Sequence, residues 1–391
     1  MKLNIGVMYG GESVEHEVSV ISAIQAMNAI DKTKYNVIPI YISKNREFYS
    51  GEELLNMDIY KDLDVLTKTV LQIVLFKENQ RVWMKPLKKK MLRSHKQVGI
   101  DVIIPVIHGT NGEDGTIQGL LEILDVSYAG CDVIAAAAGQ DKAIQKMIFE
   151  HEGLPIVPWS WFYYSDFNNQ REVYMKRIMK IGYPVIVKPA CLGSSIGITI
   201  AKNEMEALLA IETASQYDEK IVVEKAIEDL REINCSVLGD RYACKTSVLE
   251  EVTKKDVILS YQDKYTGNAK GSKGMASTQR VIPAMLDQET TQLVQKYAIT
   301  VFKSIGAAGV CRVDFMIDEK TDKLYVNEIN TIPGSLAFYL WSHTGVDFIS
   351  LMDTLIELAL ERTRRKDKMV YSYASNILAN FSNNGSKGMK Q

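Results

Sequence analysis

The chain has 391 residues, 46% of them hydrophobic and 24% charged, which is ordinary for a globular protein and too long for one small core, so two or three domains are expected. Its 46 Lys and Arg residues and 48 Asp and Glu residues leave a formal net charge of -2, which excludes a long-range field that would favour nucleic acid or an anionic membrane. The five cysteines show no CxxC pair and no histidine at metal spacing, which favours a reducing cytoplasm.

The first forty residues predict a βαβ unit. Residues 3–8 are apolar, Gly10 and Gly11 break the run, residues 18–30 have helical periodicity, and residues 35–42 are apolar again. No apolar leader precedes the first strand, and no apolar run approaches about 18 residues. We therefore expect a cytoplasmic protein that neither binds nor crosses a membrane.

The segment 44–98 is irregular and charged, and is interpreted as a solvated insertion. A buried strand over 101–107 and a helix over 116–124 follow. The composition then becomes helical and rich in alanine, and two prolines precede an irregular stretch, so a domain seam is placed near residue 138. The predicted domains are 1–138, 139–227 and 228–365, followed by a flexible tail over 366–391.

The second half of the chain alternates strands with loops. The predicted elements are strands over 184–188 and 221–225, a hairpin of 233–238 with 243–249, a glycine-rich segment over 265–276, and a helix over 347–363.

A second hairpin, of residues 310–318 and 323–330, carries the strongest chemical signal. With the turn centred on Thr321, antiparallel pairing places Asp314 opposite Glu328 and Arg312 opposite Asn330, all on one face. On the other face Phe315 and Ile317 are expected opposite residues 327 and 325. Two carboxylates facing each other across a ladder repel unless a cation lies between them, so the hairpin predicts a site for Mg²⁺ or Mn²⁺ with nucleotide phosphates. A solvated strand face is the alternative.

A glycine-rich loop follows the strand that ends at Lys188. Gly193 and Gly197 enclose Ser194 and Ser195, so backbone N–H groups and two hydroxyls can approach a phosphate closely, beside the charge of Lys188. The loop is not a Walker A sequence, and no GxGxxG follows the first strand, which disfavours P-loop and dinucleotide-binding folds.

These motifs, in this order, resemble those of the ATP-grasp ligases. The motifs are Lys188-Pro189, Gly193 to Gly197, Glu224-Lys225, Arg312-Val313-Asp314 and the run from Asn327 to Gly334. Within that superfamily three more resemble the D-alanine:D-alanine ligases: Gly10-Gly11 with Glu15, His108-Gly109 with Gly112 to Gly115, and Asp263-Lys264-Tyr265. The resemblance runs from about residue 3 to about residue 363. It implies an α/β chain with an ATP-grasp fold, α+β in its ATP-binding part, behind an N-terminal Rossmann-like domain.

The resemblance also implies roles for individual residues. Those matching ATP-binding positions are Lys142, Lys188 and Lys264 at the phosphates, Ser195 in the phosphate loop, Glu224, Lys225 and Ile227 at the adenine, and Glu232 at the ribose. Those matching the metal ligands for two Mg²⁺ or Mn²⁺ ions are Asp314, Glu328 and Asn330. Those matching the catalytic positions are Glu15, Ser194 and Tyr265, which would orient the first D-alanine. Arg312 and the backbone N–H of Gly334 match the site of the oxyanion, and His108 matches a residue near the carboxylate of the first substrate.

The chain departs from the family pattern at two places. Tyr339, followed by Leu340, falls where the family has the serine that holds the second substrate's carboxylate, so the second pocket is expected to be reshaped. Leu192 stands where many relatives carry an acidic residue that supports a lid. Tyr265 favours an amine as the acceptor.

The implied reaction joins two D-alanines, with ATP, through an acyl phosphate, to supply a peptidoglycan precursor. The alternatives are a ligase that joins D-alanine to another small D-amino acid such as D-serine, a ligase for a different carboxylate and amine, and a module that holds nucleotide without turnover. The implied partners are small molecules and a second copy of the chain in a homodimer, with no nucleic acid and no membrane.

Overall fold

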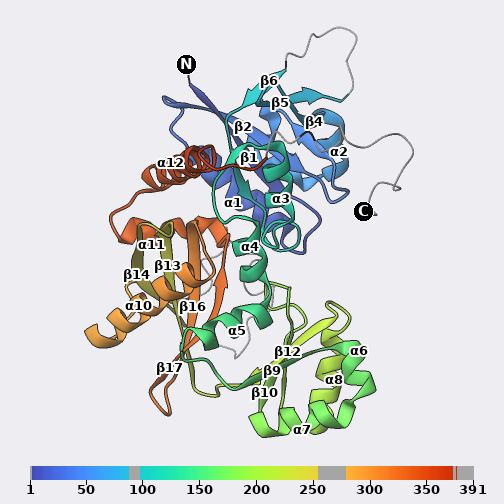
Figure 1. Ribbon diagram of the computed structural model, residues 1–391, viewed down its shortest axis with the longest axis vertical. Helices are drawn as coiled ribbons and strands as arrows, with labels where there is room; N and C mark the ends of the chain where they lie inside the picture. Colours follow the sequence, from blue (N-terminus) through green and yellow to red (C-terminus); the bar gives the residue numbers. More distant parts are fainter. Residues whose placement is uncertain (1, 88–96, 254–278, 373–375, 377–391) are drawn as a thin grey trace, which may run out of the picture.

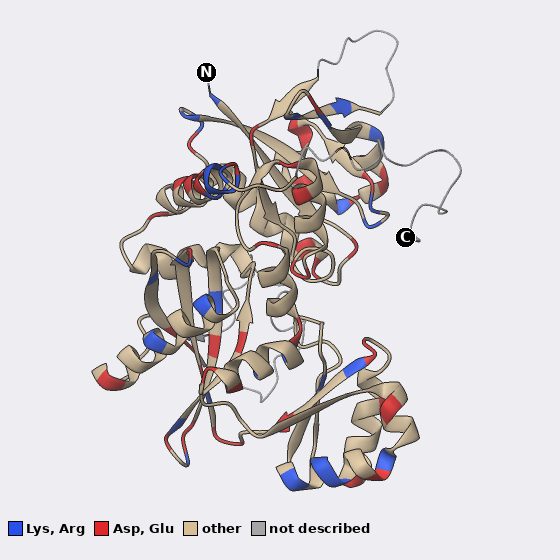
Figure 2. Cartoon of the chain, viewed as in Figure 1, with Lys and Arg blue, Asp and Glu red and all other residues tan. Residues whose placement is uncertain are grey.

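The computed structural model describes residues 2–87, 97–253, 279–372 and 376, which form three sheets along the long axis of the molecule (Figure 1). Lys264, Tyr265, the glycine-rich segment over 265–276 and most of the tail lie outside the described residues. Acidic and basic residues are interspersed over all three parts in the view of Figure 2. No helix within the described ranges is long and apolar enough to cross a membrane.

The first sheet has eight strands in the order β6-β5-β4-β3-β2-β1-β7-β8. Its parallel part consists of β1 (Leu3–Gly10), β2 (Tyr35–Ile42), β7 (Val102–Val106) and β8 (Ser127–Tyr128), with helices α1 (His16–Ala29) and α3 (Thr116–Leu124). The expected βαβ unit is confirmed, and α1 begins two residues earlier than expected, directly after Glu15.

The interpretation of residues 44–98 as a solvated insertion was wrong. This segment forms β3 (Phe48–Ser50), β4 (Leu71–Glu78), β5 (Arg81–Pro86) and β6 (Val98–Ile100), which extend the sheet antiparallel, together with η1 (Glu52–Leu55), η2 (Met57–Lys61) and α2 (Leu63–Thr69). Ile73, Val82 and Met84 are buried in a core, while the other face mixes polar residues such as Lys85 with the large apolar side chains of Phe76 and Trp83. Strands that bury only one face contain enough charge to look like loop in the sequence.

The second sheet in chain order, at the lower end of the view in Figure 1, has the order β11-β10-β12-β9. Its elements are β9 (Trp159–Tyr163), α6 (Tyr164–Asn169), α7 (Arg171–Ile181), β10 (Val185–Pro189), β11 (Thr199–Ala201), α8 (Glu204–Ala214) and β12 (Lys220–Lys225). Its core contains Phe162, Ile178, Val187 and Ile211, all from this stretch of chain. The first strand and the last strand are neighbours, with Trp159 paired to Glu224.

The third sheet has the order β15-β14-β13-β16-β17. Its strands are β13 (Leu230–Gly239), β14 (Cys244–Thr253), β15 (Gln279–Val281), β16 (Gly309–Asp318) and β17 (Lys323–Asn330). The helices around it are α4 (Val133–Gln140), α5 (Lys142–His151), α10 (Gln288–Ser304), η3 (Gly334–Ala337), α11 (Phe338–His343) and α12 (Phe348–Lys366). Helix α12 packs back on the first sheet, where Leu351 and Leu355 share a core with Val7 and Val102 (Figure 1). Helix α4 runs across residue 138, and the domain boundaries stay predictions.

The predicted pairing of the β16–β17 hairpin is confirmed at its functional end. Arg312 pairs with Asn330 and Asp314 pairs with Glu328. Nearer the turn the prediction was wrong, because Phe315 pairs with Val326 and Ile317 with Leu324. Asn327 is the extra residue of a β-bulge, which shifts the register by one.

Candidate active site

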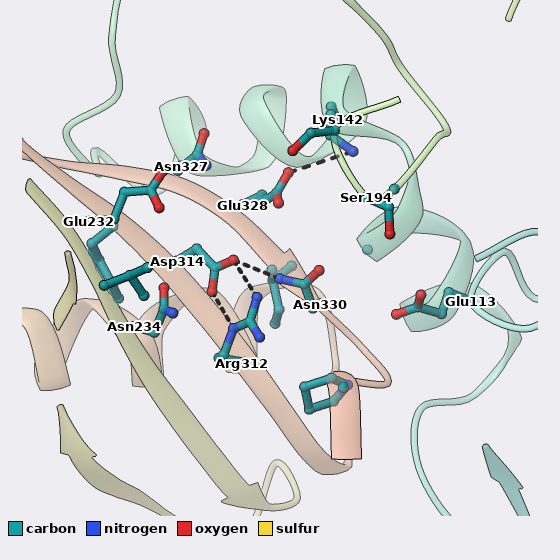
Figure 3. Close-up of a pocket in the computed structure, with 18 of the residues that line it drawn as sticks. Glu113, Lys142, Ser194, Glu232, Asn234, Arg312, Asp314, Asn327, Glu328 and Asn330 are labelled. Carbon is teal, nitrogen blue, oxygen red and sulfur yellow. Dashed lines mark hydrogen bonds and ion pairs between the residues drawn. The ribbon is translucent and has the colours of Figure 1, made fainter. Parts of the chain in front are cut away.

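A cavity is lined by strand residues of the second and third sheets and, beside the first sheet, by residues that follow β1 and β7, such as Glu15 and His108 (Figure 3). The predicted site residues that line it are Glu15, His108, Lys142, Lys188, Ser194, Ser195, Glu224, Glu232, Arg312, Asp314, Glu328, Asn330, Gly334 and Tyr339. Three of the predicted site residues that the structure describes are not among its lining residues. Lys225 donates to the carbonyls of Gly182 and Tyr183, Ile227 packs against Val157 and the lining residue Met316, and Leu340 is buried.

The hairpin β16–β17 presents its polar face to this cavity. The Arg312 guanidinium donates two hydrogen bonds to Asp314, with Nε 2.6 Å from Oδ1 and one terminal nitrogen 2.8 Å from Oδ2. Asn330 Nδ2 donates to the same carboxylate at 3.0 Å, and Lys142 Nζ lies 3.6 Å from Glu328. Burial raises the pKa of Asp314, Arg312 opposes this, and the carboxylates of Glu328 and Glu232 add to the rise. The face therefore holds a local surplus of carboxylate charge (Figure 3).

This surplus suits a divalent cation that brings phosphates with it. No group of three His, Cys, Asp or Glu residues in the described ranges could hold a metal ion without help. Mg²⁺ typically takes one or two protein carboxylates and completes its shell with water and nucleotide phosphates. Asp314 and Glu328, with the amide oxygen of Asn330, fit that requirement.

A buried charge cluster lies at the other end of the cavity. The Glu224 carboxylate contacts Lys146 at 2.7 Å and also forms an ion pair with Lys188. Burial opposes ionisation of Glu224, but the two ammonium groups outweigh it and lower its pKa to about 2. Lys146 was missed in the sequence because a lysine one helical turn after Lys142 looks like part of a solvated helix face.

The phosphate loop is joined to the N-terminus of helix α1. The Ser194 hydroxyl donates to the Glu15 carboxylate, and Ser194 has a positive φ of 56°. A Cβ added at Gly193 would lie 2.7 Å from Glu15 Oε2, and one at Gly109 would lie 2.8 Å from the same atom. A side chain at either position would therefore displace the Glu15 carboxylate from where it lies. The sequence predicted contacts that link Glu15, Ser194 and Tyr265. The hydrogen bond between Ser194 and Glu15 is present, and Tyr265 lies outside the described residues.

His108 and Glu113, in the segment that follows β7, form hydrogen bonds with the backbone of Ile332 in the loop after β17. His108 Nδ1 lies 2.8 Å from the Ile332 carbonyl and Nε2 lies 2.9 Å from the Ser22 hydroxyl, so both ring nitrogens have protein partners. Burial lowers the pKa of His108. The Glu113 carboxylate accepts from the backbone N–H groups of Gly109 at 2.8 Å and Ile332 at 3.0 Å. Glu113 belongs to the motif from Gly112 to Gly115, but nothing in the sequence predicted that it would accept hydrogen bonds from these two backbone groups.

A further polar cluster, near Arg312, was not found in the sequence. Tyr339 donates to Glu250 Oε2 at 3.1 Å, and Asn234 donates to the same oxygen at 3.1 Å. The Arg280 guanidinium lies over the Tyr339 ring, 4.8 Å from its centroid, and 3.1 Å from Glu250 Oε1. All four residues line the cavity.

The comparisons with known proteins cover nearly the whole chain. Residues 4–131 match the family described as D-ala D-ala ligase N-terminus, and residues 148–357 match the D-ala D-ala ligase C-terminus. The D-alanine–D-alanine ligase of Thermosipho melanesiensis is 40% identical over 379 residues, covering 96% of this chain and 98% of the relative. The one from Caldicellulosiruptor bescii is 39% identical over 376 residues, covering 95% and 99%.

Solved structures agree in fold. The D-alanine-D-alanine ligase from Coxiella burnetii superposes with a TM-score of 0.79 at 30% identity, covering 94% of this chain and 96% of that one. The VanG D-Ala:D-Ser ligase from Enterococcus faecalis gives 0.76 at 29% identity, covering 92% and 100%. The chain therefore belongs to the D-alanine:D-alanine ligase family and has its ATP-grasp fold, as its motifs indicated.

Proposed function

We propose that this protein joins two D-alanine molecules into D-alanyl-D-alanine at the expense of ATP, for peptidoglycan precursor synthesis. The observation that carries the proposal is the pairing of Arg312 and Asp314 with Asn330 and Glu328 across one ladder, in a cavity shared with the Ser194 loop. Near full-length relatives named D-alanine–D-alanine ligase support the choice of substrates.

In the first step the carboxylate of one D-alanine attacks the γ-phosphorus of ATP, and ADP leaves. Lys142 and Lys188 border the cavity and offer positive charge for the phosphates. Asp314, Glu328 and Asn330 would hold two Mg²⁺ or Mn²⁺ ions, which supply charge neutralisation at the phosphates when bound. Glu15, fixed by Ser194, would orient the amino group of this D-alanine.

In the second step the amine of the other D-alanine attacks the acyl phosphate, and inorganic phosphate leaves. Negative charge develops on the former carbonyl oxygen. The Arg312 guanidinium, which cannot lose its proton, and the backbone N–H of Gly334 would stabilise that charge. Water must be kept out during this step, because an acyl phosphate hydrolyses easily.

The test is ADP release with D-alanine alone, with D-alanine plus other amino acids, and with no amino acid, followed by mass analysis of the product. Dipeptide from D-alanine alone supports the proposal. Nucleotide binding without turnover under every condition contradicts it and favours a non-catalytic module.

D-serine is the second candidate for the acceptor. Tyr339 stands at the position matched to the second substrate, and a solved D-Ala:D-Ser ligase is among the similar structures. In the same assay, a mixed product that outcompetes D-alanyl-D-alanine at equal concentrations would favour D-serine. The homodimer rests on the family alone, and light scattering of the purified protein tests it.

A further inference from the structure

The cavity must hold the carboxylate of the second amino acid as well as the triphosphate. A carboxylate removed from water requires a cation or several hydrogen-bond donors. Among the described residues that line the cavity, the Lys and Arg residues are Lys142, Lys188, Arg280 and Arg312. Lys188 is paired with Glu224 and Lys142 lies beside Glu328, at the phosphate end, while Arg312 is bound to Asp314 by two hydrogen bonds.

Arg280, on strand β15, has donors to spare. Its contact with Glu250 uses one terminal nitrogen, and its buried Nε has no hydrogen-bond partner among the residues that the structure describes. A guanidinium carries five N–H donors in a planar fork that matches a carboxylate. A buried unpaired N–H is costly, so an occupant of the cavity that accepts a hydrogen bond there is favoured.

The side chains around Arg280 fix the direction of the fork. Its guanidinium lies over the Tyr339 ring, and the fully buried Glu250 accepts hydrogen bonds from Tyr339 and Asn234 on its other oxygen. Arg280, Arg312 and Tyr339 line the same cavity, where burial raises the pKa of the Tyr339 hydroxyl and the charges of both arginines oppose that rise. Arg280 therefore offers its donors in the same cavity that Arg312 borders.

We propose that Arg280, held by Tyr339 and Glu250, binds the α-carboxylate of the second amino acid and restricts the acceptor to amines that carry a free carboxylate. The proposal rests on the ligase function proposed above and names the determinant of its acceptor. Tyr339 and Glu250 are positioning residues, which act through the orientation of the guanidinium.

The test is a competition between two acceptors, D-alanine and D-alaninamide, at equal concentrations with ATP. D-Alaninamide lacks the carboxylate, so it can accept but cannot be activated. The ratio of the free dipeptide to its amide, measured by mass spectrometry, reports recognition of the acceptor carboxylate alone. Arg280→Met should lower this ratio by roughly 10- to 100-fold, the value of a hydrogen bond to a charged group, while the KM for ATP stays unchanged.

Arg241→Met is the matched control, because Arg241 also lies over a tyrosine ring, that of Tyr242, on the exposed surface. It should leave the ratio unchanged. If Arg280→Met does not fold, the same ratio is measured for Arg280→Lys. Lysine keeps the charge but lacks the planar fork, so this variant should also lower the ratio. An unchanged ratio, or an equal loss of both products, overturns the role of Arg280. Absence of both products with the wild-type protein refutes the ligase function itself.

Discussion

The Arg312 side chain has one observed role and one proposed role. It neutralises Asp314 through two hydrogen bonds, and it is the guanidinium proposed to face the developing oxyanion. Because such donors act mainly in the transition state, Arg312→Ala should lower kcat by at least about 100-fold. Steady-state ADP release measures this, with circular dichroism to verify the fold. Near-normal turnover would remove Arg312 from the chemistry.

The pKa of Glu113 makes the stability of the folded protein depend on pH in a defined direction. Burial and the nearby Glu15 raise its pKa to about 8, against the two backbone N–H groups that lower it. The folded pKa therefore lies above the unfolded value of about 4.3, so the folded state binds the proton more tightly. The stability from this group is fully present below about pH 4 and is lost as the pH rises through about 8.

The neutral variant Glu113→Gln should therefore show a smaller decline in the free energy of unfolding between pH 5 and pH 8.5 than the wild type, in urea unfolding at a series of pH values. An equal decline in both proteins would show that Glu113 ionises freely in the folded chain.

The site residues that were predicted from the sequence are brought together by a local hairpin, whereas those that were missed are brought together by the tertiary fold. Asp314 and Arg312 were predicted to meet Glu328 and Asn330 because a short hairpin fixes which residues face each other. Glu250 and Arg280 lie on strands β14 and β15, and only the tertiary pairing of those strands brings them to one cavity. Local periodicity does not contain that information.

Helix α5 carries two lysines that differ in what they stabilise. Lys142 faces the cavity, whereas Lys146 is fully buried against Glu224 of strand β12. Removal of one partner from a buried ion pair leaves a buried charge with less compensation, so Lys146→Met should lower the free energy of unfolding by about 3 kcal/mol. Urea unfolding measures the change.

The matched control is Lys296→Met, on the exposed face of helix α10, which should change stability by no more than about 0.5 kcal/mol. Equal effects of the two substitutions would mean that the Lys146 pair contributes nothing specific.

At the scale of elements, the sequence predicted the apolar strand β7 and the β16–β17 hairpin with its polar turn, but not the strands in which charged and apolar residues are mixed on one face. The buried strand β7 was found, whereas β4, β5 and β6 were taken for loop. The bulge at Asn327 was also beyond the sequence, because an inserted residue changes the register without changing the composition.

At the scale of the whole molecule, all three parts of the chain border one cavity: the second and third sheets supply strand residues, and the N-terminal part supplies residues of helix α1 and of the loops after β1 and β7. A ligand bound there stabilises the folded state by about 2.7 kcal/mol at a hundredfold excess over Kd. ADP with Mg²⁺ should therefore raise the Tm by several degrees, and the same ADP with EDTA should raise it much less, because Asp314 and Glu328 would then repel the phosphates. Differential scanning fluorimetry compares the two. Equal shifts would place the nucleotide away from these carboxylates.

The pairing of Trp159 with Glu224 means that the chain enters and leaves the second sheet at almost the same point. Since that sheet also has a hydrophobic core of its own, the segment is a natural cassette. An exchange of residues 159–225 for the same segment of a relative would therefore need only this one junction, provided that the incoming segment keeps Glu224 for the buried Lys146 and Ser194 for Glu15.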